Sequence, residues 1–124
     1  MLILFYSKTG NIRRFSNKLT KRGFVCKDIL EHPKVEEDFV LITPTHGFGQ
    51  IPDAVQLFLR NNLEHLVAVA SSGNKVWGND LFGKSGETIA DVYNVPLLHK
   101  FQSQGFESDV DIFIERVLSL GKMD

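Results

Sequence analysis

A group of polar residues that could hold an anion directly follows the apolar segment at the start of the chain. Residues 2–6, LILFY, are succeeded by Ser7, Lys8, Thr9, Gly10 and Asn11. A helix that begins near Asn11 leaves its first N–H groups unpaired, and these groups together with the helix dipole favour a phosphate. The hydroxyl groups add donors, and the glycine lets the backbone approach closely. The alternative is that Thr9 or Asn11 only caps the helix.

Two further loops contain residues suited to a flat aromatic ligand. One loop consists of Thr43, Pro44, Thr45, His46, Gly47, Phe48, Gly49 and Gln50, and the other of Ser71, Ser72, Gly73, Asn74, Lys75, Val76, Trp77 and Gly78. Stacking on Phe48 or Trp77 would contribute about 0.5–1.5 kcal/mol beyond burial. Asn74 offers a donor and an acceptor to the edge of a heterocycle. For each aromatic ring, the alternative is that it folds back onto the core.

Other motifs in these segments match different chemistry but lack its context. Residues 78–85, GNDLFGKS, fit the Walker A pattern, yet residues 71–77 separate them from the nearest apolar run, whereas a P-loop follows its strand directly. The segment after Gly47-Phe48-Gly49 lacks the third glycine of a dinucleotide-binding fingerprint. The histidines show no metal-ligand spacing, and we expect His46 to be a solvated loop residue rather than a proton donor. We therefore expect no catalytic side chain and no metal site.

Alternating apolar runs and helical patterns must position these loops. We expect strands at residues 2–6, 24–30, 39–42, 66–70 and 95–101, the second of them polar enough for a sheet edge. Helices are expected over residues 11–22, from Pro52 onward and over residues 85–93, where Ile89 and Val92 should point inward. A last helix should begin where Ser108 and Asp111 form a capping pair. Runs that are apolar at every position indicate a parallel sheet covered on both sides.

This alternation predicts an α/β fold with a five-stranded parallel sheet in the order 2-1-3-4-5 and helices on both faces. In that order the three polar loops follow strands 1, 3 and 4, which are neighbours, and the order reverses between strands 1 and 3. Ligands of open α/β sheets bind in the crevice at such a reversal. The sequence therefore predicts that the three loops form one site.

Composition narrows the class of protein. The 124 residues fit a single domain, 1–124, and the net charge of −1 gives no basic footprint for nucleic acid. No run approaches the ~20 apolar residues that a membrane span needs. The single cysteine, Cys26, excludes an internal disulfide framework. We expect it to be a packed structural thiol in a protein of the reducing cytoplasm.

Three segments resemble the NrdI family of flavodoxin-like proteins, and the resemblance covers essentially the whole chain. These segments are Gly47-Phe48-Gly49-Gln50-Ile51-Pro52, Ser72-Gly73-Asn74-Lys75-Val76-Trp77-Gly78 and Asn94-Val95-Pro96-Leu97-Leu98-His99-Lys100-Phe101. The resemblance implies that Ser7 to Asn11 hold the phosphate of FMN. It also implies that Thr43 to Gly49 and Ser71 to Gly78 flank the isoalloxazine ring, with Trp77 stacking on it. His46 and Ser71 depart from the family pattern, which has a small or hydroxyl residue and an alanine at these positions.

The same resemblance implies a small redox flavoprotein that activates class Ib ribonucleotide reductase. Proteins of this family use reduced FMN and dioxygen to make a superoxide-type oxidant. They pass it to the dimanganese small subunit, where a tyrosyl radical is assembled, and an unidentified reductase is expected as electron donor. Two alternatives stay open. One is a general flavodoxin-type one-electron carrier, and the other is a non-catalytic binding or receiver module, which the Thr43-Pro44 end of the third strand disfavours.

Overall fold

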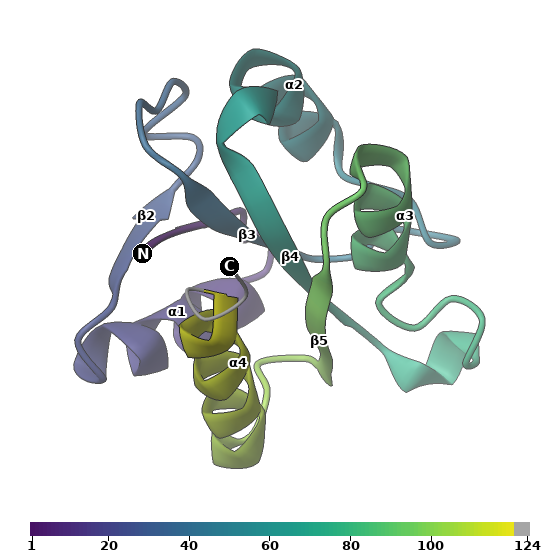
Figure 1. Cartoon of the computed structure of the whole chain (residues 1–124). Coiled ribbons are helices and arrows are strands. Elements are labelled where there is room, and N and C mark those ends of the chain that lie inside the picture. Colours follow the sequence, from purple (N-terminus) through teal and green to yellow (C-terminus); the bar gives the residue numbers. More distant parts are fainter. Residues whose placement is uncertain (121–124) are drawn as a thin grey trace.

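The computed structural model describes residues 1–120, and this part contains five strands and four α-helices, with no helix between the second and third strands (Figure 1). The strands are β1 (Leu2–Phe5), β2 (Val25–Asp28), β3 (Phe39–Thr43), β4 (Leu66–Gly73) and β5 (Leu97–Gln102). The helices are α1 (Asn11–Lys21), α2 (Asp53–Asn62), α3 (Lys84–Tyr93) and α4 (Glu107–Leu120), with the short 3-10 helices η1 (Leu63–His65) and η2 (Lys75–Trp77). The last four residues of the predicted domain 1–124 lie outside the described residues.

All strands pair in parallel in the order β2-β1-β3-β4-β5, which confirms the predicted sheet. Helices α1 and α4 cover one face of the sheet and α2 and α3 cover the other (Figure 1). Alternate residues of β1 serve opposite cores. Ile3 and Phe5 pack on the side of α1 and α4, whereas Leu2 and Leu4 pack on the side of α2 and α3. Because both faces are covered, the central strands are apolar at nearly every position.

The segment between α3 and β5 differs from the prediction in two details. β5 begins at Leu97 rather than at residue 95, because Asn94 ends α3 in the left-handed conformation and the Val95 N–H still bonds to the Ala90 carbonyl. The prediction that Val92 points inward is wrong, since its side chain is 65% exposed. The short helix buries only a narrow stripe, which follows the sheet and leaves Val92 on the solvent side.

The start of α4 also differs from the prediction. The helix begins at Glu107, earlier than the expected opening at Ser108. Asp109, rather than Asp111, reaches back to the backbone, where it accepts a hydrogen bond from the Phe106 N–H at 2.7 Å. Asp111 instead forms an exposed ion pair with Arg22 of the segment after α1, at 2.7 Å.

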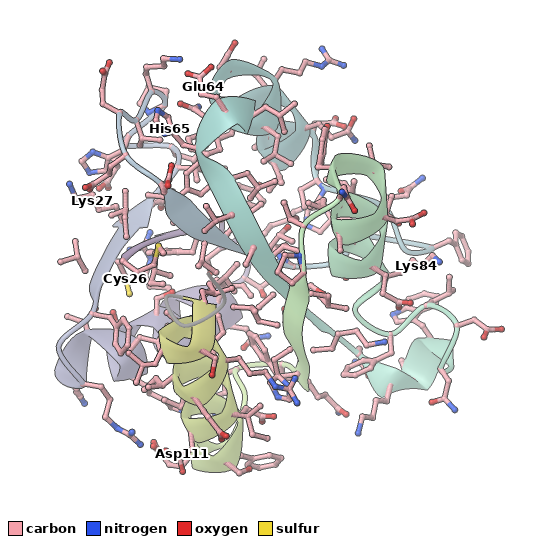
Figure 2. The ribbon with its side chains drawn as sticks, in the orientation of Figure 1. Cys26, Lys27, Glu64, His65, Lys84 and Asp111 are labelled. Atoms are coloured by element: carbon pink, nitrogen blue, oxygen red, sulfur yellow. The ribbon has the colours of Figure 1, made fainter. Side chains whose placement is uncertain are left out.

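β2 forms a sheet edge, as its polarity predicted. Val25 is exposed, whereas Asp28 is buried and pairs with Arg13 of α1 at 2.6 Å. Cys26, labelled on this strand in Figure 2, packs partly against the core beside α1. Burial raises the pKa of its thiol, and a hydrogen bond with Thr20 only partly opposes this. A protonated, packed thiol is consistent with the predicted structural role.

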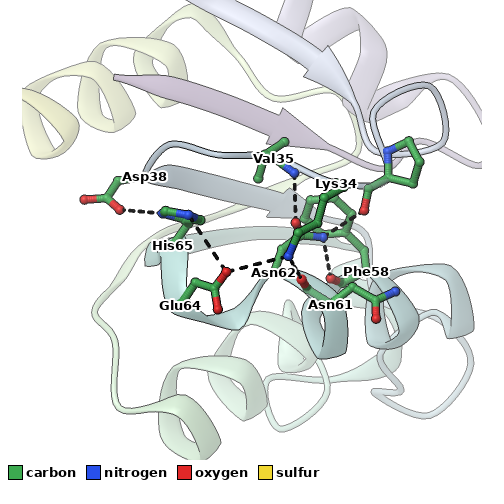
Figure 3. A network of polar contacts seen from close by, with 9 residues as sticks. Lys34, Val35, Asp38, Phe58, Asn61, Asn62, Glu64 and His65 are labelled. Carbon is green, nitrogen blue, oxygen red and sulfur yellow. Dashed lines mark hydrogen bonds and ion pairs between the residues drawn. The ribbon is translucent and has the colours of Figure 1, made fainter.

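A buried asparagine fixes the long connection between β2 and β3 (Figure 3). The side chain of Asn62, at the end of α2, accepts a hydrogen bond from the Val35 N–H at 2.9 Å. It donates to the carbonyls of Pro33 and Phe58, both at 2.9 Å. These three bonds tie an irregular segment to a helix, which satisfies backbone groups that the sheet cannot reach.

Candidate functional site

A cleft opens at the C-terminal ends of β1, β3 and β4, where the strand order reverses between β1 and β3. Its empty volume, including the open mouth, is about 750 Å³. Parallel strands bring their C-terminal ends to one edge of a sheet, so the loops that wall this cleft are remote in sequence and close in space.

The cleft joins residues of all three predicted loops. Its lining includes the predicted residues Ser7, Lys8, Thr9, Asn11, Pro44, Thr45, Gly47, Ser72, Gly73, Asn74 and Trp77. Six predicted residues lie outside this lining, namely Gly10, Thr43, Phe48, Gly49, Ser71 and Gly78. The lining also contains Ile12, Leu81 and Ser103, which the sequence reasoning did not select, and His46, which it placed in the second loop as a solvated residue. Ser103 follows β5 at the same sheet edge, and its position after a strand is the signal that could have found it.

The backbone at the start of α1 leaves amide groups facing the ligand side of the loop. Gly10 is the N-cap residue, with φ 93°, and it has no side chain with which to cap the helix. Ser7 accepts a hydrogen bond from the Arg13 N–H through its Oγ at 3.1 Å. Within residues 1–120 the N–H groups of Asn11 and Ile12 have no acceptor. The alternative of a side-chain cap from Thr9 or Asn11 is therefore wrong, and the helix start keeps two donors for an anion.

Charge at the cleft has one sign. Among the lining residues none is acidic, and Lys8 supplies a cation. The guanidinium of Arg14 lies beside Gly10, since a Cβ added to Gly10 would lie 3.6 Å from Arg14 Nη1. The same Nη1 donates a hydrogen bond to Asn11 Oδ1 at 3.1 Å. Cations near a helix N-terminus add to its attraction for a negatively charged group.

The two loop aromatics lie together at the mouth of the cleft. Phe48 is 75% exposed and Trp77 is 51% exposed, so neither ring folds back onto the core. Their ring centroids are 5.6 Å apart and the planes meet at 77°, an edge-to-face contact. Trp77 lines the cleft and Phe48 supports it from outside. The indole thus has a defined place before any ligand binds.

A turn fixes the position of Trp77. The side chain of Asn74 accepts a hydrogen bond from the Val76 N–H at 3.0 Å, and this bond caps η2. Because the carbonyl oxygen of Asn74 is used in the turn, its NH₂ group is the part left to bind a ligand.

The loop after β3 is closed by a short antiparallel bridge. His46 and Gln50 exchange backbone hydrogen bonds of 2.9 and 2.7 Å. Gly49, with φ 89°, also touches α3, where an added Cβ would lie 2.8 Å from Lys84 Cγ. Only glycine therefore fits this position, although the residue does not line the cleft.

Buried hydroxyl groups join the cleft loops to the start of α3. Ser85 Oγ donates to the Pro44 carbonyl at 2.9 Å and shares a 2.8 Å hydrogen bond with Thr45 Oγ1. Ser71 Oγ donates to the Gly83 carbonyl at 2.8 Å. We call Pro44, Thr45, Ser71, Gly83 and Ser85 the anchoring cluster.

The anchoring cluster explains two features of the sequence. Ser71 is fully buried, and its hydroxyl holds the loop before α3, which gives a physical reason for a serine where the family pattern has alanine. Ser85, the last residue of the Walker-like segment, is also fully buried, and both its bonds go to protein groups. Its hydroxyl is not available to a metal-bound nucleotide, and the Walker-like spelling is a chance match.

His46 differs from the expectation of a solvated histidine. Its ring is only partly exposed, and its Nε2 is buried without a hydrogen-bond partner within residues 1–120. Burial lowers the pKa of His46, the charge of Lys8 lowers it further, and Asp53 partly opposes the shift. At neutral pH the imidazole is therefore uncharged.

Residues 1–120 contain neither a membrane-spanning helix nor a cluster of metal-ligating side chains. No helix there is long and apolar enough to cross a bilayer. No group of three or more His, Cys, Asp or Glu side chains lies in an arrangement that could bind a metal ion.

Solved structures show the same fold. The structure of a short-chain flavodoxin associated with a bacterial microcompartment superposes with a TM-score of 0.71 at 18% identity, covering 98% of this chain and 95% of that one. Oxidised flavodoxin 1 from Bacillus cereus gives a TM-score of 0.68 at 15% identity, covering 99% of this chain and 97% of that one.

Sequence comparison identifies closer relatives. Protein NrdI from Bacillus licheniformis is 45% identical over 127 residues, covering 98% of this chain and 95% of its own length. Protein NrdI from Macrococcus caseolyticus is 42% identical over 113 residues, covering 91% of this chain and 85% of its own length. The family model described as NrdI flavodoxin-like matches residues 3–115. The chain therefore belongs to the NrdI family of flavodoxin-like proteins.

Proposed function

We propose that this chain binds FMN in the cleft and serves as the redox activator of a class Ib ribonucleotide reductase. The observation that carries the proposal is that the unpaired amides at the start of α1 and the indole of Trp77 belong to one cleft. The amides suit a phosphate and the indole suits a flat ring. Membership of the NrdI family supports the reductase as the partner.

The donor groups present fit the phosphate end of this cofactor. The N–H groups of Asn11 and Ile12, the hydroxyl of Thr9 and the ammonium of Lys8 come from one short segment. Gly10 gives that segment a left-handed backbone, which other residues adopt only with strain. The hydroxyl of Ser7 accepts from the helix start through one lone pair and keeps its own proton for a phosphate oxygen.

The ring end of the cofactor fits the other walls. Trp77 offers a face for stacking, the Asn74 amide offers a donor, and Gly73 and Gly47 leave main chain uncovered. Gly73 packs tightly enough that an added Cβ would lie 2.6 Å from the Gly83 nitrogen, so this wall has no space for a side chain. These residues bind and orient the ring, and the FMN itself supplies the reduction of dioxygen.

The oxidant made in this way is of the superoxide type and is delivered to the dimanganese small subunit, where it allows the tyrosyl radical to be assembled. The small subunit docks over the mouth of the cleft, because the oxidant must pass from the ring to the partner. Phe48 and Val76, which are 75% and 80% exposed, lie beside Trp77, Phe48 through a ring contact and Val76 as its neighbour in the chain. Exposed apolar side chains grouped in this way suit a protein partner better than water.

The charge of the lining favours this role over that of an acidic electron carrier. The lining holds Lys8 and no carboxylate, so the negative charge of a reduced ring meets little repulsion. Potentiometric titration tests the argument. The second one-electron potential should lie above that of acidic flavodoxins, and an equally low potential would remove the electrostatic part of the proposal.

The phosphate loop can be tested by equilibrium quenching of FMN fluorescence. Gly10→Val imposes a positive φ on a β-branched residue at a cost on the order of 1–3 kcal/mol, and Thr9→Val removes one hydroxyl donor. Both variants should bind FMN at least several-fold more weakly than the wild type. Riboflavin, which lacks the phosphate, is the control ligand and should lose less affinity. Unchanged FMN affinity in both variants would contradict the site assignment.

The partner can be tested with the manganese-loaded small subunit. The FMN-loaded chain is reduced with dithionite and mixed with the subunit in air, and the tyrosyl radical is measured by electron paramagnetic resonance. Radical above the level of a chain-free control supports the proposal. Electron transfer without any radical would favour the general one-electron carrier instead.

A further inference from the structure

His46 lies in the wall of the cleft and is not satisfied by the protein's own groups. Its Nε2 is buried and has no hydrogen-bond partner within residues 1–120, and the residue belongs to the cleft lining. A buried polar atom without a partner is energetically unfavourable. Such a cost at a ligand-binding wall is typical of residues that serve the ligand rather than the fold.

The groups around His46 come from three elements, and two of these groups are charged. Lys8 approaches from the loop after β1, Asp53 from the start of α2, and the uncharged Tyr6 packs edge-on with ring centroids 6.2 Å apart. Burial and Lys8 lower the pKa of His46, and Asp53 opposes them only in part. The ring is therefore neutral near pH 7, in a cleft that already contains one cation.

We propose that His46 is the proton-linked residue of this cleft, taking up a proton from solvent when an anionic group enters and pairing with that group. The inference rests on the proposed function for the identity of the ligand. The role of His46 rests on the geometry of the cleft. A negative charge in the cleft offsets the field of Lys8 and gives the imidazolium N–H an acceptor. Two parts of the cofactor carry such a charge, the phosphate and the reduced ring.

The link between anion binding and protonation of His46 decides how the anion affinity changes with pH. The protonated residue holds an anion more tightly, so a bound anion raises the pKa of His46 and binding consumes a proton. Between the pKa of the free protein and that of the complex, the affinity contributed by His46 falls up to about tenfold for each unit of rising pH. Phosphate monoesters themselves titrate near pH ~6, so the effect is read as the difference between the wild type and a His46 variant.

The experiment compares the wild type, His46→Gln and His65→Gln from pH 5.5 to 8. His65 ends η1, directly before β4 and at the opposite end of that strand from the cleft, and serves as the matched control. Dissociation constants are measured for oxidised FMN, dithionite-reduced FMN, riboflavin and inorganic phosphate. For an anionic ligand, the ratio of the His46→Gln constant to the wild-type constant should rise at least fivefold as pH falls from 8 to 5.5. The ratio for His65→Gln should stay flat.

The ligands distinguish the two sources of charge. A difference seen with oxidised FMN and inorganic phosphate but not with riboflavin assigns the phosphate as the partner of His46. A difference that appears only with reduced FMN assigns the reduced ring. Identical pH profiles for wild type and His46→Gln with every anionic ligand would overturn the proposal.

A second measurement needs no variant. The pKa of His46 is followed by NMR through its imidazole protons in the wild-type chain, alone and with inorganic phosphate, oxidised FMN or reduced FMN. The pKa should rise with at least one of these anions, and the proposal fails if it rises with none. This result is separate from the proposed function. Absence of FMN binding at every pH would refute the cofactor assignment, while the phosphate titration would still decide the proton linkage.

Discussion

Ser85→Ala tests whether the anchoring cluster holds the cleft in place. Ser85 is fully buried at the start of α3 and does not line the cleft, yet its hydroxyl bonds to Pro44 and Thr45, which do. Alanine is the better helix former and fits the same space. The substitution therefore removes hydrogen bonds without creating a clash, and any loss of ligand affinity must act through the position of the loop.

The expected magnitude follows from the bonds that are lost. Without the Ser85 hydroxyl, the Pro44 carbonyl loses its 2.9 Å donor and the Thr45 hydroxyl loses its 2.8 Å acceptor. An unsatisfied group of this kind costs about 1–3 kcal/mol, so we expect a loss of about 2 kcal/mol in the free energy of unfolding. With a urea m-value of about 1.5 kcal/mol per molar, the midpoint falls by about 1.3 M.

A double-mutant cycle with Thr45→Val distinguishes one shared network from two independent losses. Urea unfolding is measured for both single variants and the double variant, and FMN affinity is measured beside it. Coupling of about 1 kcal/mol or more is expected, because each substitution breaks the same bond. Ser119→Ala is the matched control, an exposed helical serine whose hydroxyl donates to the Glu115 carbonyl of its own helix. The reasoning is refuted if the two losses add within about 0.5 kcal/mol, or if FMN affinity is unchanged in Ser85→Ala.

Three further outcomes are expected. Trp77→Ala should weaken FMN binding by about tenfold, since stacking contributes about 0.5–1.5 kcal/mol beyond burial, whereas the adjacent exposed Val76→Ala should leave fluorescence quenching unchanged. Asn62→Ala should lower the free energy of unfolding by about 3 kcal/mol because three hydrogen bonds of a buried amide are lost. In the control Asn61→Ala, the backbone carbonyl that accepts from Lys34 is kept, so the free energy of unfolding should change by less than about 0.5 kcal/mol. Because the pKa of His46 is lowered on folding, the unfolded chain takes up a proton that the folded chain excludes as pH falls below 6.5. The free energy of unfolding of the wild type therefore declines below pH 6.5. His46→Gln should lack this contribution to the decline, and above pH 6.5 the two free energies, measured by urea unfolding, should run parallel.

The choice of fold could be predicted because its signal is local. Residues 39–42 are apolar at each position, and residues 110–118 repeat at helical spacing, so the sheet and the last helix follow from short windows of sequence. The order of the strands followed from their number, because five parallel strands with helices on both faces suit the compact doubly wound order. The boundaries were less accurate, as at β5 and α4, because capping and left-handed residues decide where an element ends.

The sequence by itself determined that three polar loops gather at one edge of a parallel sheet, since strand and helix periodicity fixes where each strand ends. Only the tertiary structure decided which polar side chains face the cleft and which are consumed by the fold. Ser71 and Ser85 look as available in the sequence as Ser72, which lines the cleft, yet the hydroxyls of both donate to carbonyls of other segments. His46 was expected to be solvated, and its Nε2 is buried without a hydrogen-bond partner among residues 1–120. The physical reason is that a hydroxyl or imidazole is satisfied by groups distant in the chain, such as Thr45 for Ser85, and no local pattern records that pairing.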